Sequence, residues 1–265
     1  MKKILIGSLL AAGMLSGQAM AFQTTATYGA PANETVGSFD TYDFGTGALA
    51  IQPTGVDGSG NVLINGAFQS FVTDHELSTL PSNKTVPSNV ETSGGYEITV
   101  IGNFTAVVDP STNKFTVTSG GFSLYLDSFG DYDFTGTGTG FDDGTLLMEG
   151  TVFAGSGFYD PTSPGGGFGY ASVLANITQT ASGVYSPVPP GGVASFLLTG
   201  ANIPGKATGV DGIPDPNNNL PAFLVGADGQ LIFVPIPAAA FLLGPVLLGG
   251  LGLQRRRGKV DQLAA

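Results

Sequence analysis

Five carboxylates stand close together in one glycine-rich stretch of the sequence, where they could bind a metal ion. They are Asp127, Asp131, Asp133, Asp142 and Asp143, all within 17 residues. Calcium prefers oxygen ligands, and neighbouring glycines let the chain bend so that several carboxylates can face one ion. No EF-hand spacing or glycine-rich nonapeptide is present. The two interpretations are therefore a calcium site formed by these five aspartates and a set of solvated acidic turns.

Other side chains that carry out catalysis are scarce. The chain has no cysteine, which excludes a thiol nucleophile, and its single histidine, His75, falls in a stretch without periodicity that predicts an exposed loop. A glycosidase needs only two carboxylates, about 5 to 9.5 Å apart, so a polysaccharide-acting enzyme is the alternative. Against it, residues 22–233 contain no tryptophan and no arginine to hold sugars. We expect no catalytic residues and no cofactor other than calcium.

The elements that must position these carboxylates are β-strands. Glycine accounts for 42 of 265 residues, and apolar residues alternate with polar ones from Ser38 to Phe44 and again between Tyr96 and Val152. This period of two is typical of strands with one buried face. Short strands joined by glycine-rich turns predict an all-β fold, either an antiparallel β-sandwich or an open barrel. Residues 22–37 lack the alternation and predict an irregular lead into the first strand.

The middle of the chain is strongly acidic. Between Phe22 and Phe233, three lysines stand against 19 carboxylates, a formal charge of −16, compared with −11 for the whole chain. Nucleic acid and anionic lipid surfaces carry the same sign of charge and are repelled. We therefore expect no nucleic-acid partner.

The first 21 residues have the parts of a secretory signal peptide. Two lysines precede an apolar run that ends at Leu15, and the small residues Ala19 and Ala21 fit the requirements of a signal peptidase. Cleavage is expected before Phe22. The protein is therefore expected to be exported.

The opposite end has the composition of a membrane segment. No residue from Leu231 to Leu253 is charged, and a charge at the bilayer centre costs about 2.5 to 3.5 kcal/mol. Two prolines delay the start of a continuous helix to about Ala238, which leaves roughly 16 residues, or ~24 Å, for a ~30 Å hydrocarbon core. Arg255, Arg256 and Arg257 then stop transfer and hold this end in the cytoplasm. We expect a transmembrane helix that is marginal as a permanent span.

These parts, in this order, resemble the PEP-CTERM sorting signals of bacteria, in the variant with a Val-Pro-Leu-Pro-Ala signature. The residues that match the signature are Val234, Pro235, Ile236, Pro237 and Ala238. Isoleucine replaces the usual leucine, and residues 258–265 extend past the arginines, where family members commonly end. The resemblance implies that an exosortase, a membrane transpeptidase, recognises the signature and detaches the helix, in hosts that usually make exopolysaccharide. The alternative is a simple C-terminally anchored envelope protein.

A second resemblance lies within the acidic part of the chain. The region from Gly95 to about Phe158, above all the turn from Gly138 to Leu147, is similar to a segment of PEP-CTERM proteins associated with flocculation. That resemblance implies a role in cell aggregation within the polysaccharide matrix, and it supplies no catalytic residues.

We therefore expect five segments. They are a signal peptide (1–21), an acidic Gly/Thr-rich β domain (22–204), a Gly/Pro/Asn-rich spacer (205–230), a sorting signal (231–257) and a short cytoplasmic extension (258–265). The expected protein is a non-enzymatic surface or matrix protein acting in aggregation, flocculation or biofilm. Its expected partners are signal peptidase, exosortase and the extracellular polysaccharide matrix, with the inner membrane as a transient anchor.

Replacing Pro235 and Pro237 with alanine tests the sorting signal. Alanines let the helix begin earlier, so that it grows from about 16 residues to about 23 and spans the bilayer. We expect a longer, unprocessed precursor in the inner membrane, whereas the wild type loses its helix and arginines. Mass spectrometry of the mature C-terminus measures this. An intact Arg255–Arg257 peptide from surface-localised wild-type protein would contradict the sorting interpretation.

Overall fold

The computed structural model describes residues 21–77, 80–85, 95–128, 130, 132–134, 139–164, 167–200, 210 and 223–235. The chain divides into two compact units, one formed by Ala21–Val234 and the other by residues 1–20 and 235–265. Apart from Pro235, the second unit lies outside the described residues. The first unit carries the fold.

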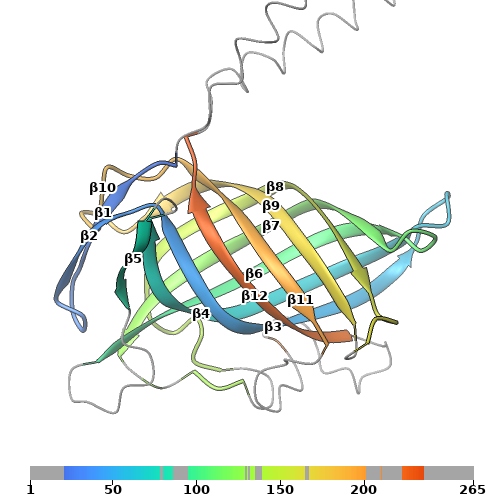
Figure 1. The fold of residues 1–265 in the computed structure, drawn as a ribbon, viewed down its shortest axis with the longest axis horizontal. Coiled ribbons are helices and arrows are strands. Elements are labelled where there is room, and N and C mark those ends of the chain that lie inside the picture. The colour runs from blue at the N-terminus through green and yellow to red at the C-terminus, as the bar shows by residue number, and fades with distance from the viewer. Residues whose placement is uncertain are drawn as a thin grey trace, which may run out of the picture. The chain divides into compact units, whose positions relative to one another are not determined.

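The described residues form twelve β-strands and no helix (Figure 1). In chain order the strands are β1 (Thr24–Tyr28), β2 (Glu34–Phe39), β3 (Thr41–Val56), β4 (Val62–Leu77), β5 (Leu80–Thr85), β6 (Tyr96–Asp109), β7 (Lys114–Ser128), β8 (Thr145–Asp160), β9 (Phe168–Thr180), β10 (Tyr185–Ser186), β11 (Gly191–Thr199) and β12 (Phe223–Phe233). The predicted all-β class is confirmed.

Eight of these strands close into an antiparallel barrel. Their order is β3-β12-β11-β9-β8-β7-β6-β4, and β3 also pairs with β4, so the sheet joins onto itself. Closure removes open hydrogen-bonding edges from the ring. The antiparallel prediction is confirmed, and a closed barrel stands in place of the expected sandwich or open barrel. β5 extends the sheet beside β4, and β1, β2 and β10 form a small separate sheet at one end of the barrel (Figure 1).

Alternation separates the inside of the barrel from the outside in the second half of β6, where Ala106 is buried and Asn103 and Thr105 are exposed. In the first half of β6 the polar residues Glu97 and Thr99 are buried as well. Successive side chains of a strand point to opposite faces, so apolar residues at every second position fill the inside. The buried residues of the barrel and of the small sheet belong largely to one continuous core.

A buried aromatic network ties the small sheet to the barrel. The Tyr28 hydroxyl lies 2.7 Å from His75 Nε2 and 2.8 Å from the Tyr42 hydroxyl, which in turn lies 2.8 Å from the Tyr185 hydroxyl. Phe39 packs edge-on against His75, with ring centroids 4.7 Å apart. Hydrogen bonds are electrostatically stronger in such a low-dielectric interior than in water. The network therefore fixes the small sheet on this end of the barrel.

Two predictions made for this end are wrong. Residues 22–37 are not an irregular lead, because β1 and most of β2 form there, with Ala26 and Val36 fully buried. His75 is not in an exposed loop, because it is fully buried in β4. The first prediction failed because strands as short as β1 and β2 give few repeats of the alternation. The second failed because a bulge in β4 between Val72 and Asp74, opposite β3, shifts the alternation just before His75.

The last strand corrects the expected domain boundaries. β12 takes in residues 223–230, which were assigned to the spacer, and the first three residues of the expected sorting signal, among which Leu231 and Phe233 are buried in the barrel. The glycine, aspartate and glutamine in 226–230 favour a loop, but pairing with both β3 and β11 holds them in a strand. The domain therefore runs to Val234. Residues 205–222 lie outside the described residues, except for Val210.

The tyrosine network predicts how the fold responds to alkali. Burial raises the pKa of Tyr28, Tyr42 and Tyr185 well above the usual value, and it raises the pKa of Tyr96 to about 12. An unfolded tyrosine ionises near pH ~10, so the stability that these groups confer is present below pH ~10 and is lost as the pH rises above it. We expect the buried tyrosines to ionise together with unfolding, as followed by tyrosinate absorbance and circular dichroism. Complete ionisation with an unchanged circular dichroism spectrum would contradict this.

Candidate functional site

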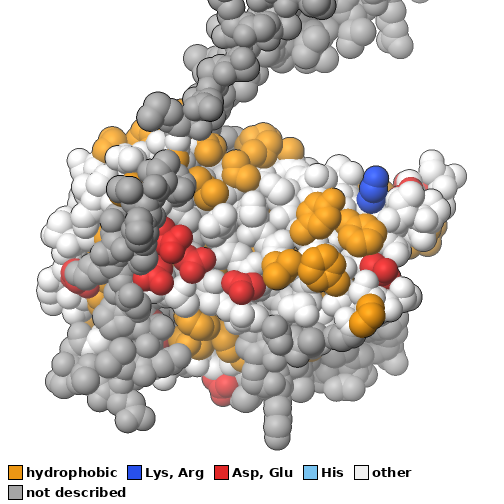
Figure 2. Space-filling model, in the orientation of Figure 1, with side chains coloured by type: hydrophobic (Ala, Val, Ile, Leu, Met, Phe, Trp, Pro, Cys, Tyr) orange, Lys and Arg blue, Asp and Glu red, His pale blue; other side chains and the backbone are white. Residues whose placement is uncertain are grey.

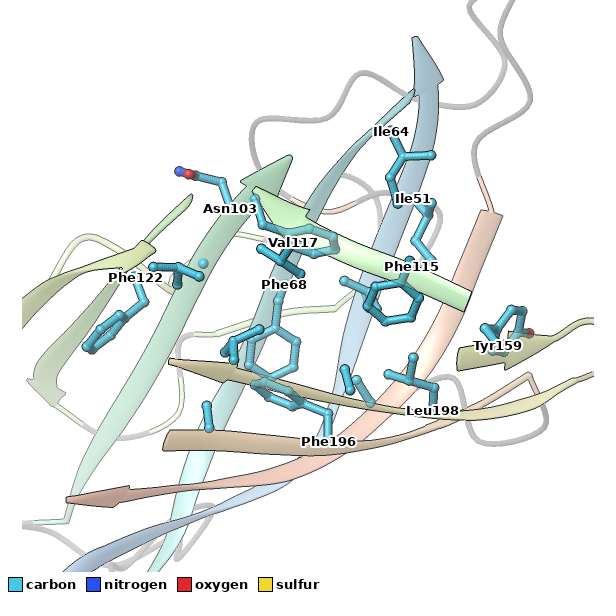
Figure 3. Close-up of a pocket in the computed structure, with 18 of the residues that line it drawn as sticks. Ile51, Ile64, Phe68, Asn103, Phe115, Val117, Phe122, Tyr159, Phe196 and Leu198 are labelled. Atoms are coloured by element: carbon cyan, nitrogen blue, oxygen red, sulfur yellow. The ribbon is translucent and has the colours of Figure 1, made fainter. Parts of the chain in front are cut away.

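The barrel contains an apolar cavity of about 320 Å³ (Figure 3). This volume falls within the ~300 to 1,000 Å³ of typical small-molecule sites. All eight barrel strands contribute to its lining, and the described lining residues include no lysine, arginine, histidine, aspartate or glutamate. The polar side-chain types in the lining are Asn103, Asn113 and Tyr159, and Figure 3 shows the amide of Asn103 pointing away from the neighbouring rings. The site can bind apolar surface, and within the part of the chain that the structure describes it contains no carboxylate or imidazole for proton transfer.

Four phenylalanine rings in the lining lie over glycines of the neighbouring strand. A Cβ atom added to any of these glycines would collide with the ring opposite it. The four cross-strand pairs are Phe104 with Gly66, Phe115 with Gly157, Phe122 with Gly150, and Phe196 with Gly229. Such covering of a glycine by an aromatic ring stabilises the glycine in a strand and pins the register. The rings therefore lie against the wall of the barrel.

The placement of these rings explains why the barrel is not filled. Protein interiors are normally packed as densely as organic crystals, and an eight-stranded barrel is just wide enough for its own side chains or for one small ligand. Here the large rings lie on the glycines, and small residues line much of the remaining wall. These small residues are Ala171, Ala175, Ala194 and Ala227. Together the two features leave the axis of the barrel free.

The cavity extends to the hairpin end of the barrel. Pro110 and Asn113, between β6 and β7, contribute to the lining, as does Pro161, which follows β8. The Tyr159 amide donates to the Asn113 carbonyl at 3.1 Å and joins the two hairpins. Burial, followed by the nearby negative charge of Asp160, raises the pKa of the Tyr159 hydroxyl.

The residues predicted to hold calcium do not form a metal-binding group in the part of the chain that the structure describes. Asp127 lies near the carboxyl end of β7, where its Oδ1 accepts a hydrogen bond from the Ser128 amide at 2.6 Å. Asp133, Asp142 and Asp143 are exposed, and Asp131 lies outside the described residues. The calcium site stays a prediction.

Aromatic residues of the same stretch hold it against the outside of the barrel. Tyr132 stacks on Phe71 of β4 with ring centroids 5.0 Å apart, and Phe134 and Phe141 pack together at 4.9 Å. Phe141 is buried, and its carbonyl accepts a hydrogen bond of 2.8 Å from the Thr99 hydroxyl. Apolar packing and this hydrogen bond therefore hold the described part of this stretch against the barrel wall.

A different set of carboxylates converges on the outer face of the barrel. Asp43, Asp74 and Glu76 each offer an oxygen within 4.8 Å of the others. Burial, followed by the neighbouring negative charges, raises the pKa of Asp43 and of Glu76. Sequence reasoning missed this group because only the pairing of β3 with β4 brings it together. Exposed acidic groups are common without an ion, so the group alone does not identify a metal site.

The predicted processing sites lie at the two ends of the compact unit. Phe22, the expected first residue after signal cleavage, donates its amide to the Phe233 carbonyl at 2.8 Å, and the Val234 amide donates to the Gly191 carbonyl at 3.1 Å. Pro235 is described, and Ala21 precedes β1. Ala19, the other three signature residues (Ile236, Pro237, Ala238) and the arginines (Arg255, Arg256, Arg257) lie outside the described residues.

No helix in the described residues is long and apolar enough to cross a membrane. The helix expected after the signature lies outside these residues.

The sequence matches no protein-family model and no curated protein, and the fold matches no solved structure. Strand alternation correctly indicated an apolar inside. It held no signal for the cavity, because that depends on where each ring lies relative to the neighbouring strand.

Gly66→Ala tests how the cavity forms. The new methyl group must push the Phe104 ring off the wall and into the cavity, and we expect a loss of about 1 to 3 kcal/mol in unfolding free energy, as for other overpacked sites. Gly55→Ala is the control, because its Cβ meets nothing within 4 Å, and we expect a change of less than about 0.5 kcal/mol. Denaturant unfolding measures both. Equal losses in the two variants would contradict the proposed ring placement.

Proposed function

We propose that the protein is a non-enzymatic binding protein whose barrel holds one small, uncharged, apolar molecule. The observation that carries this proposal is the cavity of about 320 Å³, lined from all eight strands with no charged side chain among the described lining residues. A closed barrel of this size that does not fill its own interior has the architecture of a one-ligand site. Burial of apolar ligand surface contributes roughly 25 cal/mol per Å² removed from water.

The lining also restricts the chemical class of the ligand. An ionised group brought into an apolar site loses its hydration, which is costly unless a partner charge is present. The lining residues that the structure describes include no cation and no anion, so a fatty-acid carboxylate or an amine would have no charged partner among them. A neutral, mainly apolar molecule fits this lining best.

Export and surface delivery are a second part of the proposal. The compact unit spans Ala21–Val234, and these limits coincide with the expected signal cleavage before Phe22 and with the start of the expected sorting signature. This coincidence supports a folded domain released by signal peptidase and delivered by an exosortase. We propose that the domain acts at the cell surface, in exopolysaccharide-dependent aggregation or biofilm, and not as a glycosidase.

Binding of the neutral fluorophore N-phenylnaphthylamine tests the interior site. We expect fluorescence to rise and to saturate at one molecule per chain. Ala194→Leu adds bulk to the cavity wall and should weaken this binding at least about tenfold, which corresponds to ~1.4 kcal/mol. Val193→Leu is the matched control, because Val193 is the neighbouring residue in β11 and is not part of the cavity lining.

The outcomes separate the interior site from other sources of binding. Unchanged affinity in Ala194→Leu, or an equal loss in both variants, would contradict binding inside the barrel. Decanoate, which carries a carboxylate, should compete more weakly than decanol. Stronger competition by decanoate would contradict the uncharged ligand class.

A further inference from the structure

The outer wall of the barrel carries a shallow groove, which shares only Ala171 and Phe196 with the described lining of the interior cavity. The groove crosses β9, β11, β12 and β3 and has a volume of about 380 Å³. Its lining includes an aromatic ring, an aliphatic side chain, two hydroxyl groups, an amide and two carboxylates. These are Tyr170, Leu197, Ser172, Ser195, Gln230, Asp43 and Asp228.

Strand register arranges these side chains in two parallel rows. Phe158 pairs with Tyr170, Tyr170 with Leu197, and Leu197 with Asp228, which forms a mainly apolar row across four strands. The second row lies two residues away and is polar throughout, running through Ser156, Ser172, Ser195, Gln230 and Asp43. Neighbouring strands are ~4.8 Å apart, so both rows present side chains at an even spacing.

The apolar row is unusually open to solvent. Tyr170 is 57% exposed and Leu197 is 47% exposed, and the Tyr170 ring lies 6.3 Å from that of Phe158. Figure 2 shows hydrophobic side chains gathered on one part of this face and acidic side chains beside them. Grouped exposed apolar side chains with a polar rim mark binding surfaces.

The two rows fit a ligand with an apolar face and a hydroxylated edge. A sugar ring has this form, because its C–H groups can lie on Tyr170 while its hydroxyls reach the neighbouring polar row. Serine hydroxyls and the glutamine amide both donate and accept hydrogen bonds, whereas a carboxylate accepts only and so pairs with a hydroxyl donor. Asp43 and Asp228 repel an anionic chain. A groove that crosses several strands suits an extended polymer better than a single sugar.

We propose that this groove binds one chain of a neutral polysaccharide. Tyr170 stacks against a sugar ring, and Ser172, Ser195 and Gln230 form hydrogen bonds with its hydroxyls. This inference rests on the proposed surface role and gives it a binding site. It does not depend on a ligand inside the barrel, because the groove side chains lie on the outer face.

Affinity electrophoresis of the full chain tests the site. The gels contain hydroxyethylcellulose, dextran or galactomannan as neutral polymers and alginate as the anionic one. We expect at least one neutral polymer to retard the wild type and alginate not to. Tyr170→Ala should weaken this retardation about tenfold, the size of one aromatic contact, while Tyr170→Phe retains it. Phe153→Ala is the matched control, because Phe153 is 53% exposed on β8 and does not line the groove.

Each result supports or overturns the site. No retardation by any neutral polymer, equal losses in Tyr170→Ala and Phe153→Ala, or retardation by alginate alone would overturn it. Release of reducing ends from the bound polymer would show that the protein hydrolyses it, and this result would overturn the proposal of a non-enzymatic binding site. Ala194→Leu, which fills the interior cavity, should leave polysaccharide retardation unchanged, so failure of the groove and failure of the interior site are distinguishable.

Discussion

The pairing of β3 with both β4 and β12 is the constraint on which the described domain depends. It turns an open sheet into a ring, so every strand has a neighbour on each side and a fixed inner and outer face. The inner face then becomes a single enclosed volume, and the outer face becomes a continuous wall on which residues from distant parts of the chain form rows. Both proposed sites are consequences of this closure: the cavity belongs to the inner face and the groove to the outer one.

The glycine content has a structural meaning that composition alone does not convey. Glycine weakens a strand because it offers no side chain to pack and loses more conformational freedom on folding. In this barrel, phenylalanines such as Phe104 and Phe122 compensate by covering the glycine opposite, Gly66 and Gly150 respectively. Each ring covers the backbone of the neighbouring strand. Because the ring lies against the wall, it leaves the barrel axis unfilled. The same pairs therefore stabilise the wall and keep the interior open.

The fold class could be predicted from the sequence, because alternation in long strands such as β6 and β7 is a local property. The prediction failed where local pattern is weak. β1 is too short to show a period, and β12 contains Gly226 and Gly229 and holds its strand geometry through its pairing partners. Neither the cavity nor the groove could be predicted, since both depend on register. Asp43 meets Asp74, and Tyr170 meets Leu197, only after the strands have paired.

The position of β12 in the ring also governs when the chain can fold. The last strand of the domain does not lie at the margin of the sheet. It is inserted between β3, the first strand of the ring, and β11. Until residue 233 has been synthesised, β3 and β11 each keep an open row of hydrogen-bonding groups, the arrangement that promotes aggregation. Truncation before β12 therefore leaves a broken ring with two unpaired strand edges, which favour association with other chains.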